Sequence, residues 1–253
     1  METSPGEDSN GEQPLEFAIR CLSLIYPTKM LDEDKKFLAL LPSLGIYRSL
    51  VCLSGTLPRR DFFSHFALPI IAADGASNLL FQKGIAADVV IGDWDSIKKP
   101  IAEKTKKIVI KDQSSSDFQK ALKFVRENHL SPSIILGING GYIDHILNNV
   151  GILAQTDSIG YISPNLCFAI RNHLALNLPV GTKLSLLGMS SGKINTYGLR
   201  WELENQELYF PGYTSCFNRT IAERVEFDVR EGIILLIIYL NSMEDEGSVG
   251  IGE

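Results

Sequence analysis

Residues 87–96 read Ala-Asp-Val-Val-Ile-Gly-Asp-Trp-Asp-Ser, a short run of β-forming residues that leads directly into an acidic segment. The same order recurs where residues 70–73 run into Asp74 and where residues 107–111 run into Asp112. In an open parallel α/β sheet, ligands bind outside the carboxyl ends of the strands. Carboxylates gathered there repel one another unless a cation lies among them, and Mg2+ prefers such oxygen ligands and often brings substrate phosphates with it. The pattern therefore predicts a metal–phosphate site at one edge of a parallel sheet.

Strands alternate with helices over the first part of the chain. Apolar runs predict strands at 49–53, 69–73, 87–91, 107–111 and 133–137, with helices near 32–41, 76–83, 116–128 and 143–154. The helix at 116–128 has the clearest pattern, because one apolar stripe repeats at i, i+3, i+4 and i+7. Ser116 followed by Gln119 has the spacing of a capping box, which places Asp117 in the first turn. Such alternation is typical of a parallel sheet with helices on its faces.

After about residue 156 the helical period disappears, and short apolar runs lie between glycine-rich turns. We expect separate antiparallel strands in this half at 184–187, 198–203, 207–210, 224–229 and 233–240. The predicted fold class is therefore α/β plus all-β. A disordered extension covers 1–14, an α/β domain with a Rossmann-like parallel sheet covers 15–156, and an antiparallel β-sandwich or barrel domain covers 157–253.

Composition excludes several classes of partner. The 253 residues carry a formal net charge of −6 without a long basic stretch, which argues against nucleic acid. The longest apolar run, 232–240, is far too short to span a bilayer as a helix, and the polar, acidic start does not have the pattern of a secretory signal. The four cysteines show no metal-ligand spacing, so we expect buried free thiols in a reducing cytoplasm.

Each candidate site residue also has a plain structural interpretation. Asp93 and Asp95 would point to the same side of an extended segment and so reach one ion, but a single aspartate in such a loop often caps a helix. The glycine-rich loop 137–141 would let backbone amides approach a phosphate, although such loops are common. The structural interpretation of Asp144 is a helix N-cap, and that of His145 is a structural histidine at the surface. Trp201 is either a core residue or a stacking face for a cationic aromatic substrate.

Taken together, these segments resemble the thiamine pyrophosphokinase (thiamine diphosphokinase) family from about Tyr47 to Leu240. The pair formed by Gly92-Asp93-Trp94-Asp95-Ser96 and Asp112-Gln113-x-x-Ser116-Asp117-Phe118 is the specific part of the resemblance. The remaining matches follow in the family's order: Ala73-Asp74-Gly75-Ala76-Ser77-Asn78, Gly141-x-x-Asp144-His145, Gly198-Leu199-Arg200-Trp201 and the loop 215–218.

The resemblance implies transfer of the β,γ-diphosphate of ATP to the hydroxyl of thiamine, leaving AMP. It also implies a homodimer with the thiamine sites between subunits. By this resemblance, three carboxylates would bind Mg2+ and take part in catalysis: Asp93, Asp95 and Asp117. The residues implied to lie near the metal or to bind ATP or thiamine are Asp74, Asn78, Gln113, Asp144, Trp201, Ser215 and Asn218.

The chain also departs from the family at four positions. Tyr142 and Leu79 stand where the family usually or often has arginine, Ser114 stands where an acid is common, and Phe217 replaces a serine. Two alternatives therefore remain beside the diphosphokinase. One is a metal-dependent phosphohydrolase or nucleotide-sugar enzyme with an Asp-x-Asp site, and the other is a non-catalytic homologue that binds thiamine or a nucleotide.

Overall fold

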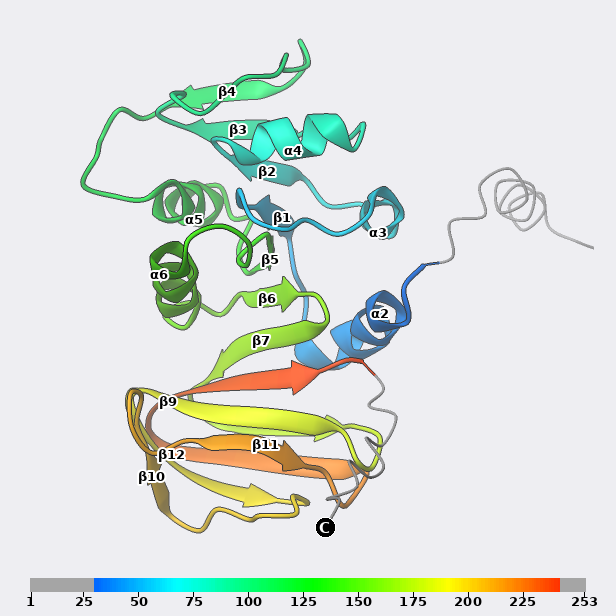
Figure 1. Ribbon diagram of the computed structural model, residues 1–253, viewed down its shortest axis with the longest axis vertical. Coiled ribbons are helices and arrows are strands. Elements are labelled where there is room, and N and C mark those ends of the chain that lie inside the picture. Colours follow the sequence, from blue (N-terminus) through cyan, green and yellow to red (C-terminus); the bar gives the residue numbers. More distant parts are fainter. Residues whose placement is uncertain (1–29, 242–253) are drawn as a thin grey trace, which may run out of the picture. The chain divides into compact units, whose positions relative to one another are not determined.

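The strands predicted for the first half form a parallel sheet (Figure 1). The computed structural model describes residues 30–241, so the predicted extension 1–14 and Cys21 lie outside the described residues. Six strands pair in parallel in the order β6-β5-β1-β2-β3-β4. Their bounds are β1 Ser49–Cys52, β2 Ile70–Ala73, β3 Val89–Gly92, β4 Lys106–Val109, β5 Ser133–Leu136 and β6 Ile159–Ile162.

Helices cover both faces of this sheet, as the alternating pattern predicts. Side chains of α5 (Asp117–Glu127) and α6 (Ile143–Leu153) pack in one apolar core with one face of the strands. Side chains of α2 (Asp32–Leu44), α3 (Arg60–Ser64) and α4 (Ala76–Gln82) pack in the core on the other face. The five-residue helix α3 was not predicted, because one turn and a half is too short to show a helical period.

The capping box predicted for α5 is present. The Ser116 hydroxyl accepts a hydrogen bond from the backbone N–H of Gln119 at 3.3 Å, and the Gln119 side chain accepts one from the N–H of Ser116 at 2.9 Å. Two of the free N–H groups at the helix start are thereby satisfied. The start of α5, and with it Asp117, is consequently fixed by local sequence.

The second half is antiparallel, which confirms the predicted fold class, but its strands are longer than expected. The bounds are β7 Asn165–Ile170, β8 His173–Asn177, β9 Lys183–Tyr197, β10 Gln206–Leu208, β11 Ser215–Arg219 and β12 Arg224–Tyr239. β12 pairs with β9 along one side, and with β8 and then β7 along the other. The separate strands expected at 224–229 and 233–240 are thus one strand.

Glycine explains why these strands continue where breaks were expected. Gly232 has φ +73° and lies between two register shifts in the pairing of β12 with β9, so it forms a bulge that bends β12 without ending it. Gly188 lies inside β9, where a Cβ atom would come within 1.9 Å of the Leu208 carbonyl oxygen. Glycine at this position allows the backbone around Leu208 to approach closely and does not end the strand.

The strand expected at 198–203 is a turn, and the loop expected at 215–218 belongs to β11. Gly198 has φ +88°, and the Glu202 carboxylate accepts hydrogen bonds from the Leu199 N–H at 2.8 Å and the Thr196 hydroxyl at 2.7 Å. These bonds close the turn. The strand prediction for 198–203 rested on apolar residues, but Leu199 and Leu203 are buried although they belong to a turn.

β6 joins the two halves into one sheet. It pairs in parallel with β5 and in antiparallel fashion with β7, so the sheet continues across the boundary expected at 156/157. Among the described cysteines, Cys52 and Cys167 are buried, and burial raises the pKa of both thiols; Cys216 is exposed, contrary to expectation. Within residues 30–241, no helix is long and apolar enough to cross a membrane.

Candidate active site

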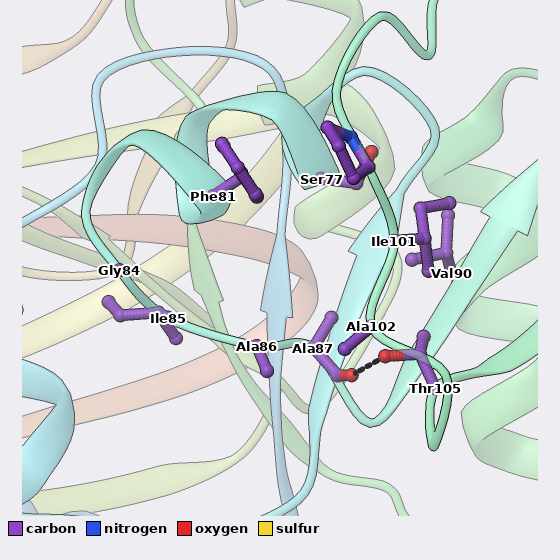
Figure 2. A pocket seen from close by; sticks show the side chains of 11 residues that line it. Ser77, Phe81, Gly84, Ile85, Ala86, Ala87, Val90, Ile101, Ala102 and Thr105 are labelled. Carbon is purple, nitrogen blue, oxygen red and sulfur yellow. Dashed lines mark hydrogen bonds between the residues drawn. The ribbon is translucent and has the colours of Figure 1, made fainter.

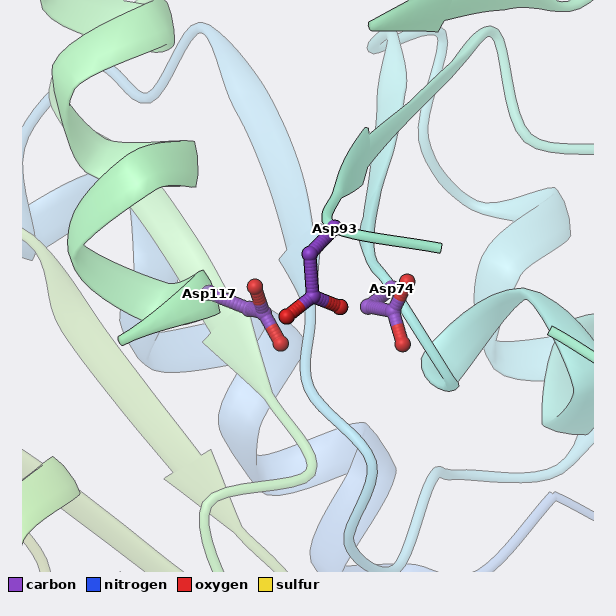
Figure 3. A group of neighbouring side chains, drawn as sticks. All are labelled: Asp74, Asp93 and Asp117. Atoms are coloured by element: carbon purple, nitrogen blue, oxygen red, sulfur yellow. The ribbon is translucent and has the colours of Figure 1, made fainter. Parts of the chain in front are cut away.

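Three aspartates converge at the carboxyl ends of β2 and β3 and at the start of α5. Figure 3 shows the side chains of Asp74, Asp93 and Asp117 pointing toward one another, and one carboxylate oxygen of each lies within 4.8 Å of the others. Asp74 follows β2, Asp93 follows β3, and Asp117 is the first residue of α5. The edge of the sheet that the sequence indicated is therefore where the acids meet.

Asp74 supports the loop that carries Asp93. It is 1% exposed, and its two carboxylate oxygens accept hydrogen bonds from the backbone N–H groups of Trp94 at 3.0 Å and Ser96 at 3.2 Å. Burial, followed by the charge of Asp117, raises the pKa of Asp74, while these hydrogen bonds lower it. A Cβ atom on Gly92 would lie 2.5 Å from that of Asp74, so only glycine fits at the end of β3.

Asp93 is held by a different partner. Its carboxylate accepts hydrogen bonds from the Gln113 side-chain amide at 2.7 Å and from the Asp95 N–H at 3.3 Å. Hydrogen bonding to Gln113, then to the Asp95 backbone, lowers the pKa of Asp93. Asp93 therefore stays ionised while it faces the two other carboxylates, and Gln113 lies beside it as the sequence indicated.

Asp95 does not join the group of three. The extended geometry expected for Asp93-Trp94-Asp95 is wrong, because Trp94 has φ +73° and turns the chain between the two acids. The Asp95 carboxylate instead accepts a hydrogen bond from the Ser96 hydroxyl at 2.8 Å. Asp95 still lines the same cavity as Asp93 and Asp117.

Lys120 lies beneath this cluster, and sequence reasoning gave it no role. It is 4% exposed, and its Nζ donates to Asp117 Oδ1 at 3.0 Å. Burial by itself lowers the pKa of Lys120, but the hydrogen bond to Asp117 and the charges of Asp117, Asp93 and Asp112 outweigh burial and raise it. The family resemblance extends through Lys120 but implied no role for it, although a lysine one helical turn after Asp117 is placed to contact that carboxylate.

The cluster opens into a cavity of about 590 Å³. Its walls come from the ends of β1 and β2, the loops after β3 and β4, the start of α5, and the first half of α6. Polar side chains dominate: those beyond the acids include Ser54, Ser96, Gln113, Ser114, Ser115, Ser116, Gln119, His145, Asn148 and Asn149. His145, which had a purely structural interpretation, therefore faces the candidate active site.

A second cavity, of about 440 Å³, lies against α4 and β3 (Figure 2). Among the described residues no charged side chain lines it: its walls are Ser77, Phe81, Gly84, Ile85, Ala86, Ala87, Val90, Pro100, Ile101, Ala102 and Thr105. The Thr105 hydroxyl is already used, because it donates to the Ala87 carbonyl at 2.7 Å. A polyphosphate or a cation would find no opposite charge on these walls, so this cavity does not suit a charged ligand.

Two sequence candidates, Asn78 and Asp144, and the family departure Tyr142 do not line the cavity and have mainly structural contacts. The Asn78 amide donates to the Ser96 carbonyl at 2.7 Å and accepts from the N–H groups of Lys98 and Lys99 at 2.8 Å each, so it braces a loop. Asp144 lies in the first turn of α6 and accepts from the N–H of His145 at 2.9 Å. Tyr142 precedes α6, is 77% exposed, and packs its ring edge-on to His145.

The candidates of the antiparallel half form a second group around Trp201. The ring of Trp201 is half exposed, and the Arg200 guanidinium lies 5.0 Å from its centroid. Asn218 is buried and brackets the Trp201 backbone, since it accepts from the Trp201 N–H at 3.2 Å and donates to the Trp201 carbonyl at 2.7 Å. It also donates to Ser215 Oγ at 3.2 Å. None of these residues lines the acidic cavity of the described chain.

Comparison with known proteins decides the family. Residues 63–161 match the model of the thiamin pyrophosphokinase catalytic domain, and residues 172–234 match that of the thiamin pyrophosphokinase vitamin B1 binding domain. Together the two matches cover more than half of the chain. The chain belongs to the thiamin pyrophosphokinase family. In this chain the three converging aspartates fall in the catalytic match, and Trp201, Ser215 and Asn218 fall in the vitamin B1 binding match.

Individual relatives agree with the family models. Thiamin pyrophosphokinase 1 of Caenorhabditis elegans is 28% identical over 66% of this chain and 77% of its own length. Thiamine pyrophosphokinase 1 of Arabidopsis thaliana is 25% identical over 72% of this chain and 83% of its own. The crystal structure of thiamine pyrophosphokinase from Bacillus subtilis has a TM-score of 0.65 at 20% identity, covering 76% of this chain and 99% of that one. This last likeness shows the shared fold.

Proposed function

We propose that this member of the thiamin pyrophosphokinase family is an Mg2+-dependent diphosphotransferase that converts thiamine and ATP to thiamine diphosphate and AMP. The observation that carries the proposal is the convergence of Asp74, Asp93 and Asp117 at the ligand-binding edge of the parallel sheet. In the reaction, the thiamine hydroxyl oxygen forms a bond to the β-phosphorus of ATP. The bond from that phosphorus to the α,β-bridging oxygen breaks, AMP leaves with the electron pair, and the hydroxyl proton is released.

The donor set fits a hard divalent cation. Oxygen atoms of three carboxylates lie within 4.8 Å of one another, and the Lys120 ammonium contacts one of them, Asp117. Asp93 and Asp117 are the proposed ligands that line the cavity, Asp74 contributes from beneath the loop, and Asp95 stands on the cavity wall as a further carboxylate. Bound Mg2+ would neutralise charge on the diphosphate during transfer.

The chain's own residues position the reactants and leave little covalent chemistry to the protein. Gln113 fixes the Asp93 carboxylate, and Asp74 fixes the loop from Trp94 to Ser96. Serine hydroxyls and asparagine amides of the cavity wall offer hydrogen bonds to phosphate oxygens. The carboxylates are the groups present that can accept the proton of the thiamine hydroxyl.

Thiamine would stack on Trp201, whose exposed ring presents a surface suited to a cationic aromatic molecule. Because no residue of the antiparallel half up to residue 241 lines the acidic cavity, a homodimer that brings Trp201 of one subunit to the cavity of another is proposed. Exposed aromatic side chains support such an interface: Trp201, Tyr209, Phe210, Tyr213 and Phe217. Light scattering that returned the mass of a single chain would argue against the dimer. The buried thiols Cys52 and Cys167 suit the proposed cytoplasmic location.

The test is a product assay on the full chain with ATP, Mg2+ and thiamine, with AMP and thiamine diphosphate resolved by chromatography. Wild type should form both products in equal amounts. Asp93→Asn and Asp117→Asn should each lose activity at least about a hundredfold, since electrostatic positioning of the phosphates is the main catalytic contribution. The matched control is Asp157→Asn, whose side chain is 89% exposed outside the cavity and which should keep full activity.

The same assay separates the alternatives. A phosphohydrolase would release inorganic phosphate from a phosphoester when thiamine is omitted. The exposed Tyr142 and the partly buried Leu79, which stand in place of arginine, are the reason to consider a non-catalytic homologue. Such a homologue would bind thiamine or ATP in calorimetry without forming product. Either result would overturn the proposed transfer. Asp95→Asn shows in addition whether the fourth carboxylate is required.

A further inference from the structure

Lys120 is a buried cation that points into the acidic cavity. It lies on α5 one turn after Asp117, is 4% exposed, and donates to Asp117 at 3.0 Å. Lys123, on the same helix, is the ordinary case, because its side chain is 73% exposed and 4.0 Å from Glu127. Burying an ammonium is unfavourable unless opposite charge surrounds it, so the position of Lys120 calls for an explanation in terms of the carboxylates around it.

Charge supplies that explanation. Asp74, Asp93 and Asp117 carry three formal negative charges within 4.8 Å of one another, and Lys120 contributes one positive charge at the edge of the same group. For these four side chains the formal sum is two negative charges, and Asp95 and Asp112 lie close enough to add to it, so the group attracts a divalent cation. Without the ammonium, carboxylates this close would repel one another whenever the cation is absent. Asp117 would also lose the hydrogen bond that fixes its direction.

We infer that Lys120 is a built-in counter-charge that holds the acidic site together before the cation arrives and limits how tightly the cation is bound. Lys120 is a positioning residue that acts through Asp117. This inference rests on the proposed metal role of the carboxylates and adds the regulation of that site. Removing the ammonium should make the cation-free protein less stable and its affinity for a divalent cation higher.

The experiment titrates Mg2+ into the full chain by calorimetry and records melting temperatures with and without Mg2+. Lys120→Met removes the charge and keeps the length of the side chain. It should bind Mg2+ about tenfold or more tightly than wild type, because a like charge near the cation is gone. Its melting temperature without Mg2+ should fall, and Mg2+ should raise it by more than it raises that of wild type.

Lys120→Arg keeps the charge and should keep an affinity near that of wild type. Lys123→Met removes an exposed charge from the same helix and is the matched control for both measurements. An unchanged or weaker Mg2+ affinity in Lys120→Met would overturn the inference while leaving the proposed function intact. Should Lys120→Met not fold, Lys120→Gln takes its place. Failure of wild type to bind Mg2+ at all would overturn the proposed metal site and this inference together.

Discussion

At the scale of single residues, identical side chains behave differently because their surroundings differ. Asp74 and Asp93 face each other, yet burial raises the pKa of the first and hydrogen bonding to Gln113 lowers that of the second. Asp74 uses both oxygens on backbone N–H groups, so it shapes the loop that presents Asp93. The site thereby combines a carboxylate that organises the backbone with one that faces the cavity.

A further aspartate, Asp34 of α2, is buried outside the candidate site, on the face of the sheet that α2, α3 and α4 cover. It is 1% exposed and accepts a hydrogen bond from the hydroxyl of Tyr161, whose ring stacks on Phe37 at 4.5 Å and on Phe62 at 5.1 Å. Burial raises the pKa of Asp34. Hydrogen bonding to Tyr161 lowers it, the charges of Glu33 and Asp61 raise it, and that of Arg59 lowers it. An acid in such surroundings favours its neutral form.

We therefore predict that Asp34 makes the protein less stable as pH rises. The contribution of the Asp34 carboxyl to the unfolding free energy is complete below the ordinary carboxyl pKa of 3.8, where it is protonated in both the folded and the unfolded chain. That contribution is lost as pH rises through the raised pKa of the folded state. Relative to Asp34→Asn, wild type should lose on the order of 1.4 kcal/mol of unfolding free energy for each unit by which the pKa is raised. Urea unfolding of both proteins at a series of pH values measures this difference.

The matched control is the exposed Asp157→Asn, measured against wild type over the same series. A difference between wild type and Asp34→Asn that stays constant or grows in favour of wild type with rising pH would contradict a raised pKa of Asp34. The comparison isolates one carboxyl, since all other titrating groups are common to the two proteins.

At the scale of elements, local signals were predictable and non-local ones were not. The α5 helix has its cap, its stripe and its first-turn acid within a dozen residues, so sequence alone placed Ser116 and Asp117 correctly. The long strand β12 depends on pairing with β9 across a bulge at Gly232, which no local pattern reveals. Glycines, which usually end strands, lie inside strands here because other backbone segments of the chain approach them closely.

The same distinction applies to the candidate site. Strand ends followed by acids predicted that carboxylates gather at one edge of the parallel sheet, and Asp74, Asp93 and Asp117 meet there, whereas the expected metal ligands were Asp93, Asp95 and Asp117. The separation of Asp95 from this group depends on the left-handed backbone of Trp94, and the role of Lys120 depends on which side of α5 is buried. Both are consequences of packing, and neither is visible in residue spacing.

Ser116→Ala tests how far the start of α5 is fixed by its cap. Loss of the hydroxyl that accepts the Gln119 N–H should lower the unfolding free energy by about 1 kcal/mol. Ser115→Ala is the matched control, because Ser115 precedes the helix and its hydroxyl donates to Asp112 instead. Chemical denaturation of the three proteins gives both values. Equal destabilisation by the two substitutions would show that the cap contributes nothing specific.

At the scale of the whole described chain, the halves share both a sheet and a core. β6 pairs with β5 on one side and β7 on the other, and a single apolar cluster runs from Phe37 and Phe62 through Tyr161 to Leu236 of β12. The change from a helical period to short apolar runs near residue 156 correctly signalled a change of architecture. It could not reveal that the sheet itself continues, because strand pairing joins residues that are distant in sequence.

This continuity predicts that the two halves unfold together. The chain has two tryptophans, Trp94 in the parallel half and Trp201 in the antiparallel half, so Trp94→Phe and Trp201→Phe each leave one fluorescent probe. In each variant, at fixed protein concentration, the fluorescence midpoint in urea should coincide with the midpoint of far-ultraviolet circular dichroism, as in an all-or-none transition. Two dichroism steps, each matching one tryptophan, would show instead that the halves are independent folding units. Coincident midpoints would mean that a substitution in the antiparallel core, such as one at Leu236, also weakens the parallel half that positions Asp74, Asp93 and Asp117.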